Sequence, residues 1–144
     1  MTVRIEGLEE VRRNLAKLSR EVRREVVQQA TKDAAEELRR DISNHINHDT
    51  AAGRPRSGKT SDFASAPGQY PKTDKGGLVR GLTTRKHSKG AAVISAVSYA
   101  VPVEFKDPAK GGRPYMGRGL HENENKIRRR VVNSLKAILR RPRA

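Results

Sequence analysis

Hydrophobic residues recur every three or four positions through the first third of the chain. The first five have the three-four spacing of an amphipathic helix: Leu8, Val11, Leu15, Leu18 and Val22. The next six are spaced by four: Val26, Ala30, Ala34, Leu38, Ile42 and Ile46. Since a helix has about 3.6 residues per turn, each step of four moves the apolar stripe by roughly 40°. The pattern predicts a long helix that kinks near Ser19 to Val22 or contacts different partners at its two ends.

Shorter patterns on both sides of a central loop predict strands and a last helix. Alternation predicts strands at Val3–Glu6, Leu78–Thr84, Ala91–Ser98 and Val101–Phe105, the last an edge strand because it contains Pro102. A basic hairpin tip, Arg85 to Gly90, joins the second and third of these. Apolar residues recur at helical spacing in the last part of the chain: Ile127, Val131, Leu135, Ile138 and Leu139. They predict a C-terminal helix over residues 120–140.

These elements indicate an α+β domain with a long N-terminal helix, a small antiparallel sheet of three to four strands and a C-terminal helix. We expect a single domain over residues 1–144: a strand and long helix at 1–46, an extended loop or arm at 47–77, the sheet at 78–119 and the helix at 120–140. Because a structureless loop of this length is unusual in a domain, we expect it to become ordered on assembly.

The loop contains a sequence that satisfies the phosphate-binding P-loop pattern, at residues 53–60. That pattern works only after a buried strand and before a helix whose N-terminus meets the phosphates. Here the polar end of a helix precedes it, and a proline-containing segment follows it. The context therefore argues against nucleotide hydrolysis.

The amino-acid composition indicates a small hydrophobic core. Only 34% of the 144 residues are hydrophobic and 3% are aromatic, and no cysteine is present. Disulfides and thiolate metal sites are thereby excluded, and we expect neighbouring subunits to supply part of the stability. No apolar run approaches the roughly 20 residues of a membrane span, so we expect no membrane association.

The net charge of +15 lies in the second part of the chain. Residues 1–50 hold ten basic and ten acidic residues, whereas residues 51–144 hold 21 basic and six acidic ones. This asymmetry indicates a surface that faces nucleic acid or an acidic protein, although a solvated basic tail would have the same composition. The candidate positions are on the hairpin tip and the last helix: Arg85, Lys86, Lys89, Arg128, Arg129, Arg130, Lys136, Arg140 and Arg141.

Four segments, in this order, resemble motifs of one protein family. They read IEGLEEV from Ile5, SAPGQYP from Ser65 with GLVRGL from Gly77, YAVPVEF from Tyr99, and RPYMGRGL from Arg113. The family patterns are GLEEL, SAPGxxPxxxTGxLxxSI, YAxxxEFG and RPFLxPAL. In these segments the chain resembles the neck and tail-completion proteins, or head-to-tail connectors, of long-tailed double-stranded DNA bacteriophages. It departs from the patterns at Lys75, Gly76, Gly81 and Lys106.

The resemblance implies a structural virion protein at the head-to-tail interface. Such a protein would form a homo-oligomeric ring that joins tail terminator or tail tube proteins to head connector or stopper proteins, with non-specific contact to packaged DNA. It would be assembled in the host cytoplasm and located in the neck or tail end of the virion, without enzymatic activity or a cofactor. The residues nearest the motifs are the candidates for assembly contacts: Tyr99, Glu104, Phe105, Arg113, Pro114, Tyr115 and Met116.

Within this set, Phe105 is expected in the core, because Phe is usually buried. Glu104 and Arg113 lie beside apolar motif residues, where a lone charge is costly, so an ion pair between them is one interpretation. Substitution of Tyr115 or Arg113 by alanine is expected to block assembly and to leave the isolated chain helical.

Two other functions compete with assembly. His45, His48 and Asp49 have the spacing of a metal site at a helix end, but a solvated polar helix terminus explains the same residues. A sequence-nonspecific nucleic-acid-binding protein would explain the basic second part of the chain. The scarcity of aromatic residues for base stacking argues against that class.

Overall fold

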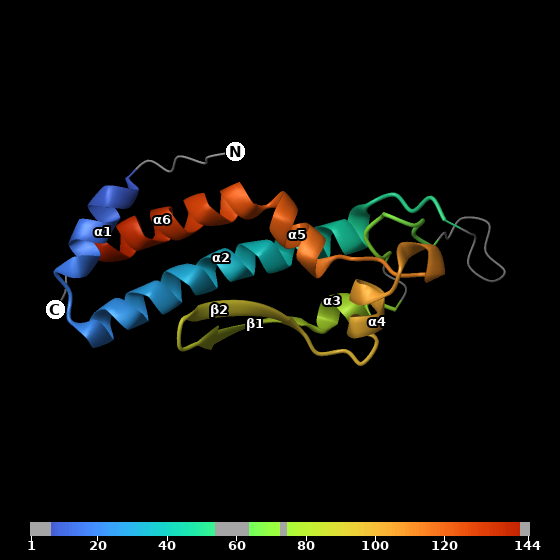
Figure 1. The fold of residues 1–144 in the computed structure, drawn as a ribbon, viewed down its shortest axis with the longest axis horizontal. Helices are drawn as coiled ribbons and strands as arrows, with labels where there is room; N and C mark the ends of the chain where they lie inside the picture. The colour runs from blue at the N-terminus through green and yellow to red at the C-terminus, as the bar shows by residue number, and fades with distance from the viewer. Residues whose placement is uncertain (1–6, 54–63, 73–74, 142–144) are drawn as a thin grey trace. The chain divides into compact units, whose positions relative to one another are not determined.

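Helices and one β-hairpin build the fold in a computed structural model that describes residues 7–53, 64–72 and 75–141 (Figure 1). The class is α+β, as predicted. The fold divides into two compact units. Unit 1 comprises Met1–Leu38, Thr84–Val93 and Asn123–Ala144, and unit 2 comprises Arg39–Thr83 and Ile94–Glu122. The predicted strand at Val3–Glu6 lies outside the described residues.

The long N-terminal helix is interrupted where the change in spacing predicts a kink. Helix α1 spans Leu8–Ala16 and α2 spans Arg20–His48. The Arg23 guanidinium holds the break, because it donates hydrogen bonds to the backbone carbonyls of Leu15, Ala16 and Leu18 at 3.0, 3.4 and 3.1 Å. The first two carbonyls lie at the end of α1 and the third lies in the break, where backbone carbonyls have few partners within a helix. The prediction of a kink is confirmed.

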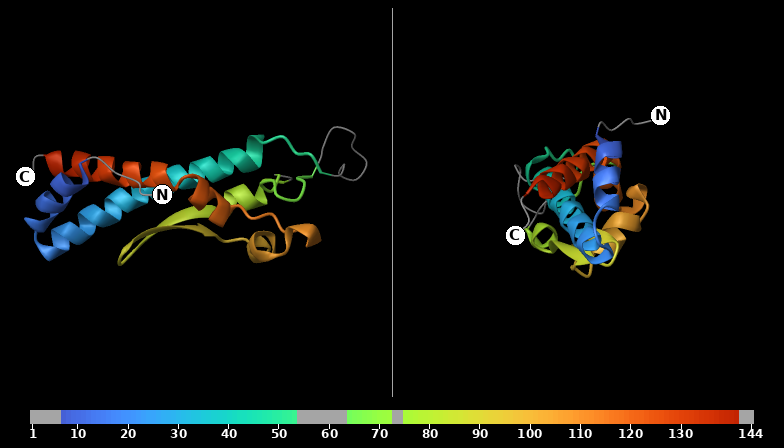
Figure 2. Two further views of the ribbon diagram at one scale, coloured as in Figure 1. Left: turned by 45° about the horizontal axis from the view of Figure 1, so that its top comes forward. Right: turned by 90° about the vertical axis from the view of Figure 1, so that its left-hand side faces the viewer.

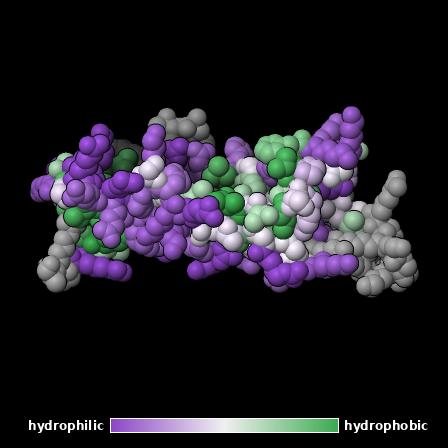
Figure 3. Space-filling view, turned by 90° about the horizontal axis from the view of Figure 1, so that it is seen from below, coloured by the Kyte–Doolittle hydropathy of each residue, from purple (hydrophilic) through white to green (hydrophobic). Residues whose placement is uncertain are grey.

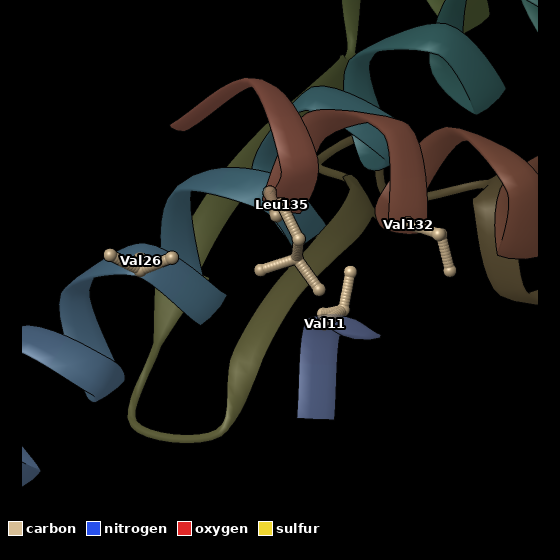
Figure 4. Packing of buried hydrophobic residues seen from close by; sticks show 5 residues of the cluster. Val11, Val26, Val132 and Leu135 are labelled. Carbon is tan, nitrogen blue, oxygen red and sulfur yellow. The ribbon is translucent and has the colours of Figure 1, made fainter. Parts of the chain in front are cut away.

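The core of unit 1 is aliphatic and comes from three helices. Helix α6, Glu124–Arg140, lies beside α1 in both views of Figure 2 and contacts it. The buried residues of this core are Val11 of α1, Val26 and Ala30 of α2, and Val132 and Leu135 of α6. Figure 4 shows Val11 pointing toward the side chains of α6. The predicted apolar faces of the first and last helices therefore meet here.

The predicted sheet is smaller than expected. Strands β1, Leu82–His87, and β2, Gly90–Ser95, form an antiparallel hairpin, the only sheet in the described parts of the chain. The predicted first half of the Leu78–Thr84 strand is helical instead, in α3, Gly77–Arg80. Gly76 begins α3 with a φ of 73°, a conformation that glycine adopts readily.

The prediction of an edge strand at Val101–Phe105 is wrong. Residues Ala100–Phe105 form helix α4. Pro102 fits its first turn, where backbone N–H groups have no partner within the helix and a missing one costs little. The alternation of residues 101–105 therefore predicted a strand where a helix forms. Pro102 is compatible with an edge strand and with the first turn of a helix.

Short elements connect α4 to the last helix. A 3₁₀ turn, η1, spans Pro108–Lys110, and α5 spans Met116–Glu122. The predicted single helix over residues 120–140 is therefore two, with Asn123 between α5 and α6. Helix α2 extends two residues past the predicted end of the first helix. In the described residues of the predicted loop before Gly77, 49–53, 64–72 and 75–76, there is no helix or strand. Most of the P-loop pattern lies outside the described residues.

The apolar stripe of α2 contacts different partners in the two units, as its drift predicts. Val26 and Ala30 belong to the core of unit 1, and Ile42 and Ile46 are fully buried in unit 2. Gly119 of α5 approaches Ile42 so closely that an added Cβ would lie 2.5 Å from Ile42 Cγ1. None of the helices in the described part of the chain has the length and apolarity that a membrane crossing needs.

Candidate assembly site

Arg113 connects three backbone segments of unit 2. Its Nε and Nη2 donate to the carbonyl oxygen of Ser65 at 3.2 and 3.0 Å. Its Nη1 donates to the carbonyl oxygens of Pro108 and Gly112 at 3.2 and 2.7 Å. A guanidinium has five N–H groups in a rigid plane, which suits such a junction. Arg113 thereby fixes the SAPGQYP segment to the RPYM segment.

Glu104 holds the start of α5. Its Oε2 accepts hydrogen bonds from the backbone N–H groups of Tyr115 and Met116 at 2.8 and 2.9 Å, and its Oε1 accepts one from Gly117 at 2.9 Å. A carboxylate is favourable here because the first N–H groups of a helix lack partners and carry partial positive charge. The suggested Glu104–Arg113 ion pair is not present among the described contacts, because both side chains bind backbone groups.

The loop before Arg113 folds back on α4. The Arg113 N–H donates to the carbonyl of Val103 at 2.6 Å, and the Gly112 N–H donates to that of Asp107 at 3.0 Å. The Lys106 carbonyl occupies the space that a Cβ on Gly112 would need. This position therefore requires glycine.

Tyr70 lies in a stack of three side chains. The His45 ring is parallel to it, with centroids 4.3 Å apart and planes at 6°, and the Arg118 guanidinium lies 4.5 Å from the centroid. The Tyr70 hydroxyl donates to Glu122 Oε2 at 2.8 Å, and Arg118 Nε donates to Glu122 Oε1 at 2.7 Å. Arg118 also donates to the Gly68 carbonyl. The stack attaches the GQYP segment to α2 and α5.

Burial and charge shift the titration of this stack. Burial, followed by the hydrogen bond to Glu122, raises the pKa of Tyr70 above its ordinary value. The hydrogen bonds from Arg118 and then Tyr70 lower the pKa of Glu122, and the same bond to Glu122 raises the pKa of Arg118. The stack is therefore most stable with a neutral tyrosine, an ionised glutamate and a charged arginine.

Gln69 and Lys72 attach the same segment to the end of α2. Gln69 Oε1 accepts from the N–H groups of Ala52 and Ala66 at 3.0 and 2.7 Å, and Gln69 Nε2 donates to the Thr50 carbonyl at 3.1 Å. Lys72 Nζ donates to the carbonyls of residues 47 and 49, both at 2.9 Å. A cation at these carbonyls complements the negative end of the helix dipole. A hollow of about 250 Å³ lies beside these residues.

Tyr115 is fully buried in unit 2, so the structure corrects its expected place at an exposed interface. Its hydroxyl and that of Ser95 are buried, and neither has a hydrogen bond of normal geometry among the described residues. Burial is the largest influence and raises the pKa of Tyr115, and the neighbouring Ser95 hydroxyl acts in the opposite direction. The neighbouring candidates Pro114 and Met116 are half-buried.

Most of the large exposed apolar residues that the structure describes in unit 2 lie on and beside α4, and one, Leu120, lies on α5. Tyr99, Val101 and Phe105 expose 47%, 65% and 80% of their surface. Val101 and Phe105 are four residues apart and therefore lie on the same side of α4. We call the surface formed by Tyr99, Val101 and Phe105 the α4 face. The expectation that Phe105 is in the core is wrong. Figure 3 shows hydrophobic patches between hydrophilic residues on the face that it draws.

The His45, His48 and Asp49 triplet forms a helix end in the described structure. His45 Nδ1 is 2.9 Å from Asp49 Oδ2, and His45 Nε2 is 3.6 Å from Asp41 Oδ2, while the ring stacks on Tyr70. His48 is exposed. The described residues contain no group of three or more side chains that could hold a metal ion.

Some of the candidate basic residues form ion pairs with acidic side chains, and others are exposed to solvent. Arg128 pairs with Glu124 at 2.6 Å, and Arg130 pairs with Glu37 at 3.3 Å. The stem of Lys136 is half-buried, and its Nζ occupies the space beside Gly7. The remaining candidates are exposed: Arg85, Lys86, Lys89, Arg129, Arg140 and Arg141.

Sequence reasoning missed the residues of the Tyr70 stack. Tyr70 and Gln69 are part of the SAPGQYP motif. Their position between the glycine and the second proline of that motif is the sequence feature that could have identified them. Arg118 and Glu122 had no such signal beyond their i,i+4 spacing, because their partner is about fifty residues away in the sequence. The comparisons with protein-family models, curated proteins and solved structures find no match to this chain.

Proposed function

We propose that this chain is a structural virion protein of the phage head-to-tail interface, a neck or tail-completion protein that forms a ring. Its own copies, the tail terminator or tail tube proteins, and the head connector or stopper proteins are the proposed neighbours. The role is architectural rather than enzymatic. The proposed location is the neck or tail end of the virion.

One observation carries this proposal. Three of the four motifs that resemble the family are joined in unit 2 by hydrogen bonds between side chains and backbone. Arg113 of the RPYM motif binds Ser65 of the SAPG motif, and Glu104 of the YAVPVEF motif binds the N–H groups of Tyr115 and Met116. The motif residues thus serve to hold loops in one arrangement, which is what an assembly part needs.

The α4 face is the proposed contact with the next subunit. Symmetric rings use heterologous interfaces, in which one surface meets a different surface of the neighbouring copy. Large aromatic side chains commonly anchor such interfaces, and Tyr99 and Phe105 are the exposed aromatic residues of this face. Helix α4 is itself fixed from behind, since Glu104 and Val103 hold the following loop and α5. The anchor is therefore presented on a rigid element.

Tyr115 is unsuited to a test of this interface, because its removal would destabilise unit 2 itself. Phe105→Ser removes an aromatic group that is 80% exposed, so the fold should remain intact. The exposed Leu8 of unit 1, replaced by serine, is the matched control.

Electron microscopy of the purified, nuclease-treated protein tests the proposal. We expect closed rings of one size, at moderate and at high salt, because apolar contacts are not screened by ions. Phe105→Ser should lose the rings, and Leu8→Ser should retain them. If the wild-type protein forms no ring by itself or with isolated tails, the proposed function is wrong.

A further inference from the structure

A basic hollow lies in unit 1 beside the start of α2 and the hairpin turn. Its volume is about 440 Å³. The polar residues that line it come from both elements: Arg20, Arg23, Arg24 and Gln28 from α2, and Ser88 and Lys89 from the turn. The sequence alone does not mark α2 as basic, because its acidic and basic residues are equal in number. The hollow appears only when the turn is placed on the helix.

Contacts within unit 1 hold the turn against α2. Gln28 Nε2 donates to the His87 carbonyl at 2.7 Å, and the Lys89 N–H donates to His87 Nδ1 at 3.2 Å. Gly90 packs on Thr31, where a Cβ would lie 3.3 Å from Thr31 Oγ1. The cation of the turn and those of the helix are therefore kept on one surface.

The cations of the hollow differ in their availability. Arg23 is used within the fold, since it binds the carbonyls at the end of α1. Arg20, Arg24 and Lys89 are exposed, and within the described ranges no acidic side chain pairs with them. Three like charges on one surface repel one another unless an anion lies between them.

The acidic residues that follow these arginines in α2 are not part of the lining of the hollow. Glu21 and Glu25 each follow one of the α2 arginines by one residue, which places them about 100° further around the helix. Among the described residues, the lining of the hollow contains no carboxylate. The site therefore presents N–H and O–H donors to an anion.

We propose that this hollow binds phosphate groups of the double-stranded DNA backbone, without reading the base sequence. Guanidinium groups match phosphate oxygens with two parallel hydrogen bonds, and neutral donors such as Gln28 and Ser88 are also common phosphate ligands. Arg85 and Lys86 extend the basic surface along the hairpin. Unit 1 as a whole holds 19 basic and 9 acidic residues, a net charge of +10. This binding is expected of the free protein as well as of a ring.

A DNA titration of charge-matched variants tests whether the hollow binds the DNA backbone. Fluorescence anisotropy measures the affinity for a labelled duplex of about 30 base pairs between about 50 and 200 mM salt. The test variant carries Arg20→Gln, Arg24→Gln and Lys89→Gln. The control variant carries Arg40→Gln, Lys106→Gln and Lys110→Gln, three exposed cations of unit 2. Circular dichroism checks that both variants fold.

The salt dependence of the DNA affinity distinguishes the test variant from the control variant. Each residue that contacts a phosphate contributes about 1 to the slope of log affinity against log salt concentration. We expect the test variant to lose about 2 to 3 of that slope, and the control variant to lose much less. An equal loss in both variants would show that only net charge matters and would overturn the site.

Competition separates phosphate from an acidic protein surface. Inorganic polyphosphate should displace the duplex at a lower charge concentration than polyglutamate does. If polyglutamate competes equally well, the hollow recognises carboxylates and the DNA assignment is wrong. Native mass spectrometry of the test variant should still show rings, so that a failure of this inference is distinct from a failure of the proposed function.

Discussion

The two units are stabilised in different ways. Unit 1 has an aliphatic core built from regular helices, with Val11, Ala30 and Leu135 at its centre. The loops of unit 2 are fixed by polar side chains that bind groups distant in the sequence. The bond from Arg113 to Ser65 spans 48 residues, and that from Tyr70 to Glu122 spans 52. Unit 2 also has buried apolar residues: Ile42, Ile46, Tyr70, Leu78, Leu82, Ala100 and Tyr115.

This difference shows how a protein with few large hydrophobic residues can hold irregular loops. Backbone carbonyls and N–H groups in a loop lack the partners that a helix or sheet supplies. In unit 2, Arg113, Glu104 and Gln69 supply those partners. Substitutions in unit 2 should therefore be sensitive to geometry, and substitutions in unit 1 mainly to apolar volume.

The largest expected effect is at the buried tyrosine of unit 2. Tyr115→Ala should lower the free energy of unfolding by about 3 to 5 kcal/mol, since it leaves a large cavity. Tyr115→Phe removes only a hydroxyl that has no hydrogen bond among the described residues, so its effect should stay within about 1 kcal/mol. Urea denaturation followed by circular dichroism measures both. A larger loss for Tyr115→Phe would show that the hydroxyl has a partner.

Gly112→Ala should lower the free energy of unfolding by about 3 kcal/mol, because the Lys106 carbonyl leaves no space for a methyl group. The matched control is Gly111→Ala. Gly111 has a φ of 99° but open space around it, so only backbone strain of about 1 to 2 kcal/mol applies. Thermal denaturation of both variants ranks them, and equal midpoints would contradict the crowding at Gly112.

The carboxylate that holds α5 gives the next effect. Glu104→Ala should lower the free energy of unfolding by about 2 kcal/mol, because three N–H groups lose a charged acceptor. The control in unit 1 is Glu124→Ala, which breaks an exposed i,i+4 pair with Arg128 and should cost at most about 0.5 kcal/mol. Hydrogen exchange should increase at Met116 and Gly117 in the first variant alone.

Acid should weaken the Tyr70 stack. The lowered pKa of Glu122 stabilises the fold at pH values above its ordinary 4.5, and this contribution is lost as the pH falls through the lower folded value. The effect should stay below about 1 kcal/mol, since solvent screens a side chain that is 40% exposed. Thermal midpoints measured from pH 6 down to about pH 3 should fall less steeply for Glu122→Gln than for the wild-type protein. Parallel curves would exclude this contribution.

A small effect is also expected in the aliphatic core of unit 1. Leu135→Met in unit 1 keeps the volume and should cost less than about 1.5 kcal/mol. Urea denaturation measures the change. A loss as large as that of Tyr115→Ala would show that unit 1 also depends on exact geometry, and would remove the contrast between the units.

The same contrast explains what the sequence predicted. Hydrophobic spacing predicted the long N-terminal helix, its break and the last helix, since these depend on periodic apolar contacts. It failed at Val101–Phe105, where alternation and proline fit a strand as well as the helix that forms. The motifs located Glu104 and Arg113 but not their partners, because no local pattern encodes a hydrogen bond to a distant carbonyl.

Native mass spectrometry of the nuclease-treated wild-type and Phe105→Ser proteins tests whether the α4 face joins the subunits into a ring. One discrete oligomer, unchanged at high salt, is expected for the wild-type protein, and monomers are expected for Phe105→Ser. Leu8→Ser should give the wild-type oligomer. The same oligomer for Phe105→Ser as for the wild type would contradict a ring that is joined through the α4 face.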